Sequence, residues 1–253
     1  MKKIILITGA TSGIGKSCAE KFAREGMNII ITGRRKSRLE ELKSSLENKY
    51  GVRVLPLCFD VQNKKEVFDS INQIPNEWKT IDILINNAGL ALGRDSFETA
   101  DVEDWETMMH TNVNGLMYVS KAVLPMMMNH GNGHIINIGS VAGQEVYENG
   151  NAYCASKFAV DALSKSMRID LLKYGIKVTA IHPGAVETDF SLVRFKGDVQ
   201  KADAAYRGYT PLRADDIADC IYFATTMPDH ACINELTITC TQQANAIYFN
   251  KNQ

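Results

Sequence analysis

The sequence has almost no net charge, and this excludes several kinds of partner. Its 253 residues include 28 Lys and Arg and 29 Asp and Glu, which gives a formal net charge of −1. Such a chain has no basic field to attract nucleic acid and no polybasic segment to attract a membrane surface. We therefore expect a small molecule or a protein as partner, with no nucleic acid and no membrane.

Long hydrophobic runs are also missing. The sequence starts with MKKIILITGA, which has two lysines before an apolar run, but that run lasts only four residues. This is too short for the hydrophobic region of a secretory signal peptide. No later segment approaches the ~18 apolar residues that a membrane-spanning helix needs. We therefore expect a cytoplasmic protein.

The cysteines lack the spacing of a disulfide framework or of a metal site. Neither Cys-x-x-Cys nor any paired Cys/His spacing occurs among them. The six positions are Cys18, Cys58, Cys154, Cys220, Cys232 and Cys240. Scattered cysteines of this kind are typical of reduced, mostly buried thiols in a cytosolic protein. We expect no metal site.

The sequence does contain a regular alternation of apolar runs and helical patterns. Its 45% hydrophobic and 23% charged residues are ordinary for a globular protein with a full core. Apolar runs typical of strands buried on both faces lie at 3–8, 28–32, 52–58, 82–89, 134–139, 176–182 and 235–240. Helical patterns separate them without a linker. We predict one α/β domain over 1–253, a doubly wound seven-stranded parallel sheet with helices on both faces.

A glycine-rich turn follows the first predicted strand. Residues 9–15 read Gly-Ala-Thr-Ser-Gly-Ile-Gly and lead into a helical pattern to about Arg24. Glycines let the backbone approach a pyrophosphate, and the helix N-terminus offers unpaired N–H groups and a positive dipole end. The spacing Gly-x-x-x-Gly-x-Gly is a variant of the common dinucleotide fingerprint, Gly-x-Gly-x-x-Gly. It indicates a dinucleotide site, with an ordinary three-glycine turn as the alternative.

Two arginines follow the second predicted strand, where the adenosine ribose of a dinucleotide is expected in such a fold. An acidic residue there would accept a hydrogen bond from the 2′-hydroxyl of NAD. Arg34 and Arg35 fit a 2′-phosphate instead, through charge-assisted contacts. They therefore favour NADP, unless they are simply the exposed start of a helix over 36–49.

Polar residues also end the next two predicted strands. Asp60 could accept a hydrogen bond from the adenine amino group, or it could cap a helix over 63–74. Asn86 and Asn87 can brace neighbouring backbone, and Gly89 lets the chain pass close to a ribose.

Asn112 interrupts the apolar pattern of a long predicted helix over 101–130. Asparagine is disfavoured inside helices. It is therefore either the mark of a kink or a functional polar group.

Tyr153 and Lys157 stand four residues apart at the start of a helical pattern over 152–174. Side chains at this spacing share one helix face. A phenol with a pKa near ~10 transfers protons poorly at neutral pH, but a fixed ammonium beside it favours the phenolate. The hydroxyl of Ser140, which ends a predicted strand, can bond the same substrate oxygen. Tyr-x-x-x-Lys alone is more often an exposed helix face, so this acid/base site is meaningful only beside a cofactor site.

A Pro-Gly break ends the sixth predicted strand, and the segment that follows, about 189–210, is polar without clear periodicity. We interpret this segment as a lid that carries the cations Arg194 and Lys196, with an ordinary surface loop as the alternative.

Taken in order, these motifs resemble those of the short-chain dehydrogenase/reductase family over essentially the whole chain. The set is Thr8-Gly-x-x-x-Gly-Ile-Gly15, Asn86-Asn-Ala-Gly89, Asn112, Ser140, Tyr153-x-x-x-Lys157 and Pro183-Gly184. Each motif is common, but the ordered set is specific. The resemblance implies a Rossmann fold and an oxidoreductase acting on CH–OH groups, with NADP as the cofactor that the arginines favour.

The resemblance also implies individual roles. Tyr153 would be the general acid/base, Lys157 would lower its pKa and hold the nicotinamide ribose, and Ser140 would position the substrate oxygen. Asn112 would support a water that relays protons to Lys157. Besides Tyr153 and Lys157, the implied cofactor contacts are Gly9, Thr11, Ser12, Gly13, Ile14, Gly15, Arg34, Arg35, Asp60, Val61, Asn87, Pro183, Gly184, Val186 and Thr188.

A narrower likeness is to the NADP-dependent 3-hydroxy acid dehydrogenase branch of that family. It is carried by NNAGLALG, DWETMM, HIINIGS, YCASKFAV, VETDFSLVRFKGD and TPLRADDIAD. It implies substrates of the serine, allo-threonine or 3-hydroxyisobutyrate type, whose carboxylate Arg194 or Lys196 could bind. Gln144 is a further candidate substrate contact, although relatives can have a basic residue in that loop.

Two other functions stay open. One is NADPH-dependent reduction of other ketones or aldehydes, which predicts an apolar lid when the substrate is bulky. The other is NADP sensing by a non-catalytic scaffold, which would have no use for a tuned phenol. The family resemblance also implies a homotetramer built on helices 102–128 and 152–174.

Overall fold

Seven parallel strands form the central sheet of the computed structural model, which describes residues 2–252. Their order is β3-β2-β1-β4-β5-β6-β9, so the chain winds outward from β1 in one direction and then from β4 in the other. The strands are Ile4–Ile7 (β1), Asn28–Gly33 (β2), Val54–Cys58 (β3), Ile83–Asn86 (β4), Gly133–Ile138 (β5), Ile176–Pro183 (β6) and Glu235–Ile238 (β9). The predicted seven-stranded parallel sheet is confirmed.

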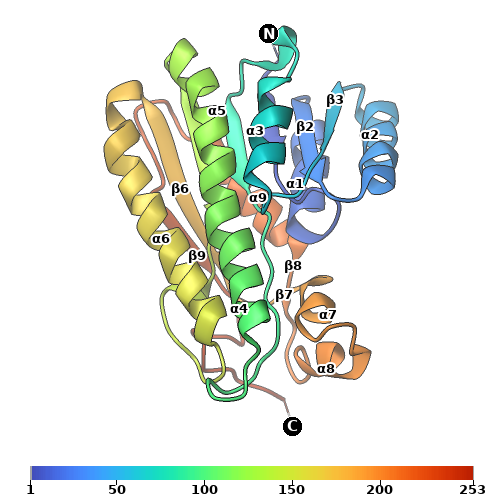
Figure 1. Cartoon of the computed structure of the whole chain (residues 1–253), viewed down its shortest axis with the longest axis vertical. Helices are drawn as coiled ribbons and strands as arrows, with labels where there is room; N and C mark the ends of the chain where they lie inside the picture. The colour runs from blue at the N-terminus through green and yellow to red at the C-terminus, as the bar shows by residue number, and fades with distance from the viewer. Residues whose placement is uncertain (1, 253) are drawn as a thin grey trace.

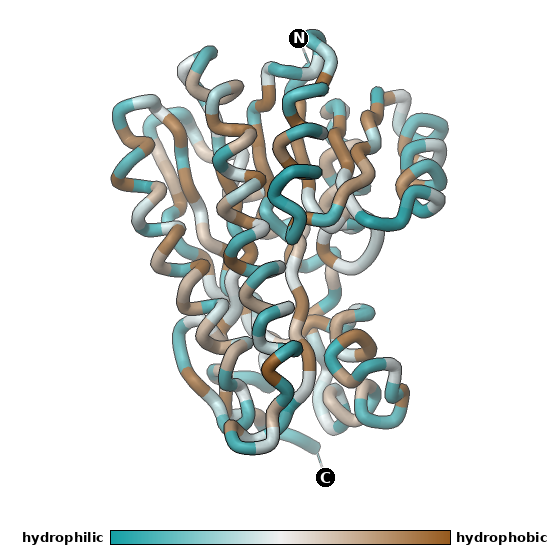
Figure 2. The backbone as a smooth tube through the Cα atoms, in the orientation of Figure 1, coloured by the Kyte–Doolittle hydropathy of each residue, from teal (hydrophilic) through white to brown (hydrophobic). Residues whose placement is uncertain are grey.

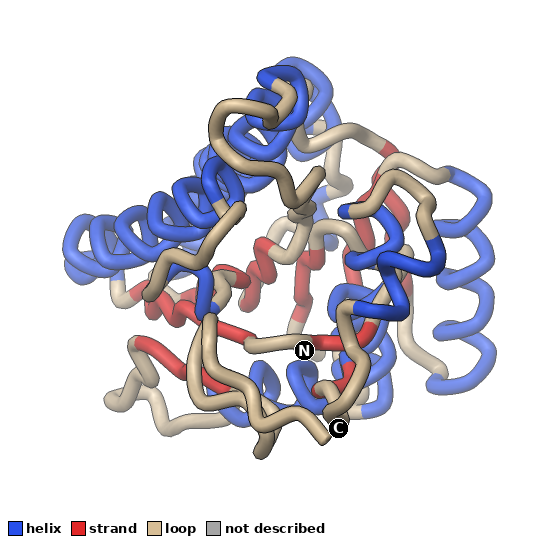
Figure 3. The backbone as a smooth tube through the Cα atoms, turned by 90° about the horizontal axis from the view of Figure 1, so that it is seen from below, coloured by secondary structure: helices blue, strands red, loops and turns tan. Residues whose placement is uncertain are grey.

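Helices cover both faces of this sheet, as Figures 1 and 3 show. The main helices are Gly13–Arg24 (α1), Lys36–Tyr50 (α2), Lys64–Asn72 (α3), Val102–Met109 (α4), Leu116–His130 (α5), Asn151–Leu171 (α6) and Ala214–Thr225 (α9). Side chains of α1, α2 and α9 share one buried cluster with the sheet, and side chains of α3, α5 and α6 share the other. The predicted doubly wound arrangement is therefore present.

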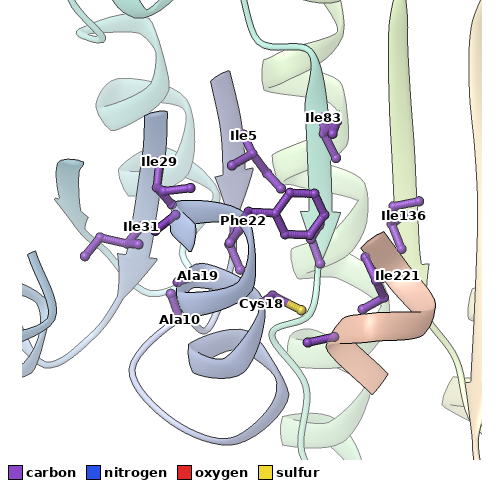
Figure 4. Close-up of a cluster of buried hydrophobic side chains, with 14 of the residues drawn as sticks. Ile5, Ala10, Cys18, Ala19, Phe22, Ile29, Ile31, Ile83, Ile136 and Ile221 are labelled. Carbon is purple, nitrogen blue, oxygen red and sulfur yellow. The ribbon is translucent and has the colours of Figure 1, made fainter. Parts of the chain in front are cut away.

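The strands read as continuous apolar runs because each of them is buried on both faces. In β1, Ile5 and Ile7 belong to the cluster on the α1 side, whereas Ile4 and Leu6 belong to the cluster on the other side. Figure 4 shows the ring of Phe22 lying over the strands that carry Ile5 and Ile83. Figure 2 shows the hydropathy of each residue, with brown (hydrophobic) on the central strands and teal (hydrophilic) on the outward turns of α2 and α3.

The predicted helix over 101–130 is not a single α-helix. A π-helical turn, His110–Gly115, separates α4 from α5. Such turns insert one extra residue into the helical repeat and are frequent at functional sites. The polar interruption around Asn112 in the sequence therefore marks a real change in helical geometry.

The predicted lid segment contains two short helices, Phe190–Arg194 (α7) and Val199–Ala204 (α8). Helices of five and six residues are too short to produce a periodic pattern, which explains why none was visible. Strands Val186–Glu187 (β7) and Leu212–Arg213 (β8) flank the segment and pair with each other. Figure 1 shows α7 and α8 beyond the carboxyl end of the sheet.

All six cysteines are free, as expected. Three of them are buried, but Cys58, the last residue of β3, and Cys232, in the loop before β9, are exposed. The expectation of mostly buried thiols is therefore wrong for these two. Among residues 2–252, no helix has the combined length and hydrophobicity that crossing a membrane requires.

A buried histidine gives the fold a predictable pH dependence. His134 of β5 bonds the Thr179 hydroxyl at 2.7 Å, and burial, with smaller effects from Lys177 and Lys3, lowers its pKa from 6.5 to about 4. Between these values the unfolded chain binds a proton that the folded chain does not. The free energy of unfolding should therefore fall as the pH drops from 6.5 to 4, by up to about 3 kcal/mol from this residue.

Denaturant titrations of the wild type and of His134→Gln across this pH range check the expectation. Other groups titrate equally in both proteins, so the difference between the two curves isolates His134. Parallel curves would contradict the assigned pKa.

Candidate active site

A cavity of about 370 Å³ lies at the carboxyl ends of the strands, where parallel α/β sheets bind their ligands. Most of the predicted site residues line it. These are Gly9, Thr11, Ser12, Gly13, Ile14, Arg34, Arg35, Asp60, Val61, Asn87, Ser140, Tyr153, Lys157, Pro183, Gly184, Val186 and Thr188. Residues spread over the first three quarters of the sequence thus meet in one cavity.

The glycine turn needs glycines for two reasons, because two of its residues have a positive φ and a third has no room for a side chain. Gly9 and Gly13 have φ of 64° and 52°, which other residues adopt rarely. Gly15 does not line the cavity, but a Cβ there would lie 2.4 Å from the Gly9 carbonyl oxygen and 2.5 Å from the Asn87 amide nitrogen. That amide donates to the Thr8 and Gly9 carbonyls at 2.9 and 3.2 Å. Asn87 therefore braces the turn, as predicted.

The N-terminus of α1 is free to hold an anion. Its N-cap, Ser12, makes no capping hydrogen bond with its side chain, so the N–H groups of the first turn are available on the cavity side. Unpaired N–H groups and the helix dipole together favour a phosphate.

Two guanidinium groups stand at the same end of the cavity. Arg35 Nη2 donates to Thr11 Oγ1 at 2.7 Å, and Arg34 Nη1 pairs with Asp60 Oδ2 at 3.5 Å. Burial and the neighbouring Arg38 lower the pKa of Arg35, so an anion here would relieve repulsion between cations. Asp60 does not cap the next helix, because the side chain of Asn63 accepts the capping N–H groups of α3.

Ser140, Tyr153 and Lys157 lie together deeper in the cavity. Ser140 follows β5 and precedes a single turn, Val141–Gly143 (η3), while the other two project from the first turns of α6. All three are buried. Lys157 Nζ donates to the Ile138 carbonyl at 2.9 Å and lies 5.9 Å from the centroid of the Tyr153 ring. Ser140, Tyr153 and Lys157, which the sequence predicted to share one site, therefore lie together in the structure.

Lys157 was expected to lower the pKa of Tyr153, but it is not among the groups that shift the pKa of this phenol in the structure. Burial raises the pKa of the Tyr153 phenol, while a hydrogen bond with Ser140 and the charge of Arg194 act in the opposite direction. Burial also lowers the pKa of Lys157 to about 8. The ammonium bonds a backbone carbonyl instead of the phenol, so Ser140 and Arg194 are the groups that favour the phenolate in this structure.

Asn112 is both the mark of a changed helix and a structural polar group. It lies in the π turn with 2% of its surface exposed, and it does not line the cavity. Its amide nitrogen donates to the Leu90 carbonyl and the Ser156 hydroxyl at 2.8 and 2.9 Å, and its oxygen accepts from Leu90 N at 2.8 Å. Asn112 thereby ties the loop after β4 to α6.

Of the four predicted substrate contacts, Ser140 and Arg194 lie near the phenol, and Lys196 and Gln144 do not. The guanidinium carbon of Arg194 is 5.5 Å from the Tyr153 ring centroid, and its Nε donates to the Gly93 carbonyl at 3.1 Å. Lys196 instead pairs with Asp104 at 2.8 Å, and the Gln144 amide bonds Thr237 Oγ1 at 3.0 Å. None of Arg194, Lys196 and Gln144 is among the residues that line the cavity. Lys196 and Gln144 are each held by a charged or polar partner elsewhere.

Sequence reasoning missed three aromatic and apolar residues beside the phenol. Phe190 and Val193 of α7 line the cavity, and the Phe190 ring lies 5.7 Å from that of Tyr153. Their spacing of three residues in an otherwise polar segment was the available signal. The ring of Tyr147, 5.7 Å from the Arg194 guanidinium, gave no signal in the sequence.

Comparisons with known proteins agree with this geometry. A family model for short chain dehydrogenase matches residues 3–197. Sulfoacetaldehyde reductase 2 of Chromohalobacter salexigens is 44% identical, over 96% of each chain. The NADP-dependent 3-hydroxy acid dehydrogenase YdfG of Escherichia coli K12 is 44% identical, over 96% of this chain and 97% of the other. The closed form of a serine dehydrogenase complexed with NADP+ superposes with a TM-score of 0.92, at 42% identity over 99% of this chain and 100% of the other.

The close contacts of Gly15 predict a loss of cofactor binding on a minimal substitution. In Gly15→Ala the new methyl group would push the turn and the Asn87 amide apart, so the dissociation constant for NADP+ should rise at least about 10-fold. Fluorescence titration measures it.

Gly26→Ala is the matched control. Gly26 also has a positive φ, 82°, but nothing lies within 4 Å of its Cβ position. This variant should lose stability and keep its NADP+ affinity. Equal affinities for the two variants would show that crowding at Gly15 is unimportant for the site.

Proposed function

Since the chain belongs to the short-chain dehydrogenase family and is an NADP-dependent oxidoreductase acting on CH–OH groups, we propose that its substrates are short-chain 3-hydroxy acids. The acids in question are of the serine, allo-threonine or 3-hydroxyisobutyrate type. The relatives named as 3-hydroxy acid and serine dehydrogenases support this choice. The position of Arg194 beside Tyr153 is the observation that carries it.

In the proposed reaction NADP(H) supplies or accepts the hydride, and the side chains of the cavity bind, orient and move a proton. The glycine turn, Arg34 and Arg35 would hold the cofactor's phosphates. The Tyr153 Oη would exchange the proton of the substrate hydroxyl, while Ser140 donates a hydrogen bond to the same oxygen. Lys157 would hold the cofactor ribose. The water relay through Asn112 stays a prediction.

Arg194 would bind the carboxylate of the acid. A guanidinium forms charge-assisted, bidentate hydrogen bonds with a carboxylate. With the carboxylate held there, the substrate hydroxyl would need to reach the Tyr153 Oη. The apolar side chains of Phe190 and Val193 would exclude water from the reacting carbon. Segment 189–210, which carries all three residues, would act as the lid within the single domain.

A second candidate is the reduction of a short aldehyde that carries a sulfonate. The similarity to a sulfoacetaldehyde reductase favours it, and a guanidinium binds a compact sulfonate as readily as a carboxylate. Reductases of bulky neutral ketones would not need this cation. The scaffold alternative has no support, because the chain is an NADP-dependent dehydrogenase. A homotetramer and a cytoplasmic location stay predictions.

The substrate proposal predicts that Arg194→Met raises the KM for 3-hydroxy acids by about 10- to 100-fold, because a charge-assisted hydrogen bond is lost. NADPH formation with a panel of D- and L-3-hydroxy acids, simple secondary alcohols and isethionate measures it. Arg207→Met is the control, since Arg207 is an exposed cation of the same segment, whereas the Arg194 guanidinium lies over the Tyr153 ring. Equal KM values for Arg194→Met and the wild type would contradict the proposal.

The arginine pair should determine the choice between the two nicotinamide cofactors. Arg34→Gln combined with Arg35→Gln should weaken NADP+ at least about 10-fold and leave NAD+ within about threefold, because only NADP+ carries the 2′-phosphate. Arg38→Gln, an exposed neighbour outside the cavity, should change neither. An unchanged NADP+:NAD+ ratio in the double variant would rule out the phosphate contact.

A further inference from the structure

His182 is a fully buried histidine directly behind the Ser140 loop, and the proposed reaction assigns it no role. It is the last residue but one of β6, with none of its surface exposed. Its Nδ1 lies 3.3 Å from the Ser140 carbonyl oxygen. Because a carbonyl can only accept, this contact is a hydrogen bond only when Nδ1 carries the hydrogen.

The other ring nitrogen faces a group that cannot donate to it. Nε2 has no hydrogen-bond partner within residues 2–252, and it lies 3.7 Å from Asp161 Oδ1. Asp161 is already paired with Lys165 at 2.7 Å. Of the remaining charges around the ring, Glu235 lies near both Lys165 and Arg168, at 3.7 and 3.8 Å.

These charges leave the imidazole neutral. Burial lowers the pKa of His182 and Lys157 adds to that effect, while the Ser140 carbonyl, Asp161 and Glu235 act against it. Two cations already balance the two carboxylates, so neither an imidazolium nor a metal ion is needed between them. A hydrogen on Nδ1 bonds the acceptor that lies within hydrogen-bond distance of the ring, the Ser140 carbonyl, and leaves Nε2 without a hydrogen-bond partner among residues 2–252, 3.7 Å from Asp161 Oδ1.

The imidazole also limits where the backbone before Ser140 can lie. A Cβ on Gly139 would lie 2.6 Å from His182 Nδ1, so only glycine allows this approach. Gly139 N donates to the Ile181 carbonyl at 2.7 Å, and Gly143 N donates to the same Ser140 carbonyl that faces the ring, at 2.9 Å. The ring and the η3 turn therefore hold the Ser140 peptide group from two sides.

We propose that His182 is a positioning residue that acts through Ser140. The hydrogen on Nδ1, donated to the Ser140 carbonyl, fixes the peptide group from which the serine hydroxyl reaches the substrate oxygen. The proposal rests on the proposed role of Ser140 in the reaction. Since a misplacement of about 1 Å at a reacting group can cost about 10²-fold in rate, loss of this donor slows turnover without affecting cofactor binding.

The ring tautomer can be measured without any assay of activity. The chain has five histidines, and His182→Asn assigns the signal of interest in a spectrum of protein labelled with 15N in histidine. The proposal expects a protonated Nδ1 and a bare Nε2 at pH 7. A hydrogen on Nε2 overturns it. A Zn2+ titration that shifts the His182 nitrogens in the wild type, and no longer in Asp161→Asn, overturns it in favour of a metal site.

A double-mutant cycle separates positioning from general support of the fold. With the best 3-hydroxy acid of the panel, His182→Leu should lower kcat about 10-fold with NADP+ affinity unchanged, because leucine fills the space without a donor. His182→Asn, whose amide can replace Nδ1–H, should recover most of kcat. In a Ser140→Ala background, His182→Leu should cost less than about twofold more.

The cycle also keeps this proposal distinguishable from the proposed function. The same 10-fold loss in both backgrounds would show that His182 supports the fold in general, and would overturn the proposal. Full activity of Ser140→Ala would instead refute the role of Ser140 itself. The NMR measurement of the His182 tautomer does not depend on either of these kinetic results.

Discussion

Lys157 places an ammonium group inside the protein, and the structure around the cavity depends on how that charge is accommodated. A buried charge destabilises a fold unless it is hydrogen-bonded, and here the Ile138 carbonyl at the end of β5 accepts from Nζ. Helix α6 can approach this carbonyl because Gly143 has no side chain, since a Cβ there would lie 2.6 Å from the Lys157 carbonyl oxygen. The same approach brings Tyr153 beside Ser140, so one backbone contact organises the acid/base site.

A buried polar layer connects this site to the middle of the sheet. Asn86 of β4 donates to Ser120 of α5 and to Asn137 of β5, and Asn137 donates to Ser164 of α6. These hydrogen bonds limit the arrangements that the side chains can take, and one atom of the network, Asn86 Oδ1, has no hydrogen-bond partner within residues 2–252. The hydrogen bonds fix α6 in rotation and in height on the sheet, and therefore fix where the phenol and the ammonium enter the cavity. Asn112 extends the same principle to the loop after β4 through Leu90 and Ser156.

The sequence was most informative where one residue's role follows from its own type and position. Strands buried on both faces produce long apolar runs, and glycines such as Gly15 stand where a methyl group would not fit, so the fold and the position of the glycine turn could be predicted. The binding of the cofactor by this turn stays a prediction. Contacts between residues far apart in the sequence could not be predicted. Asp104 pairs with Lys196, 92 residues away, and burial raises the pKa of the phenol while Ser140 and Arg194 lower it. Neither fact can be predicted from neighbouring residues in the sequence. The positions of Tyr147 and His182 beside the site could not be predicted in this way either.

The central claim is that the Tyr153 phenol transfers the substrate proton while other residues bind the cofactor. The most direct test is to measure kcat and the dissociation constant of NADP+ for Tyr153→Phe, with the best 3-hydroxy acid as substrate. We expect kcat to fall about 10³-fold, as when a general acid/base is removed, with NADP+ affinity unchanged within about threefold. A kcat close to that of the wild type would contradict it.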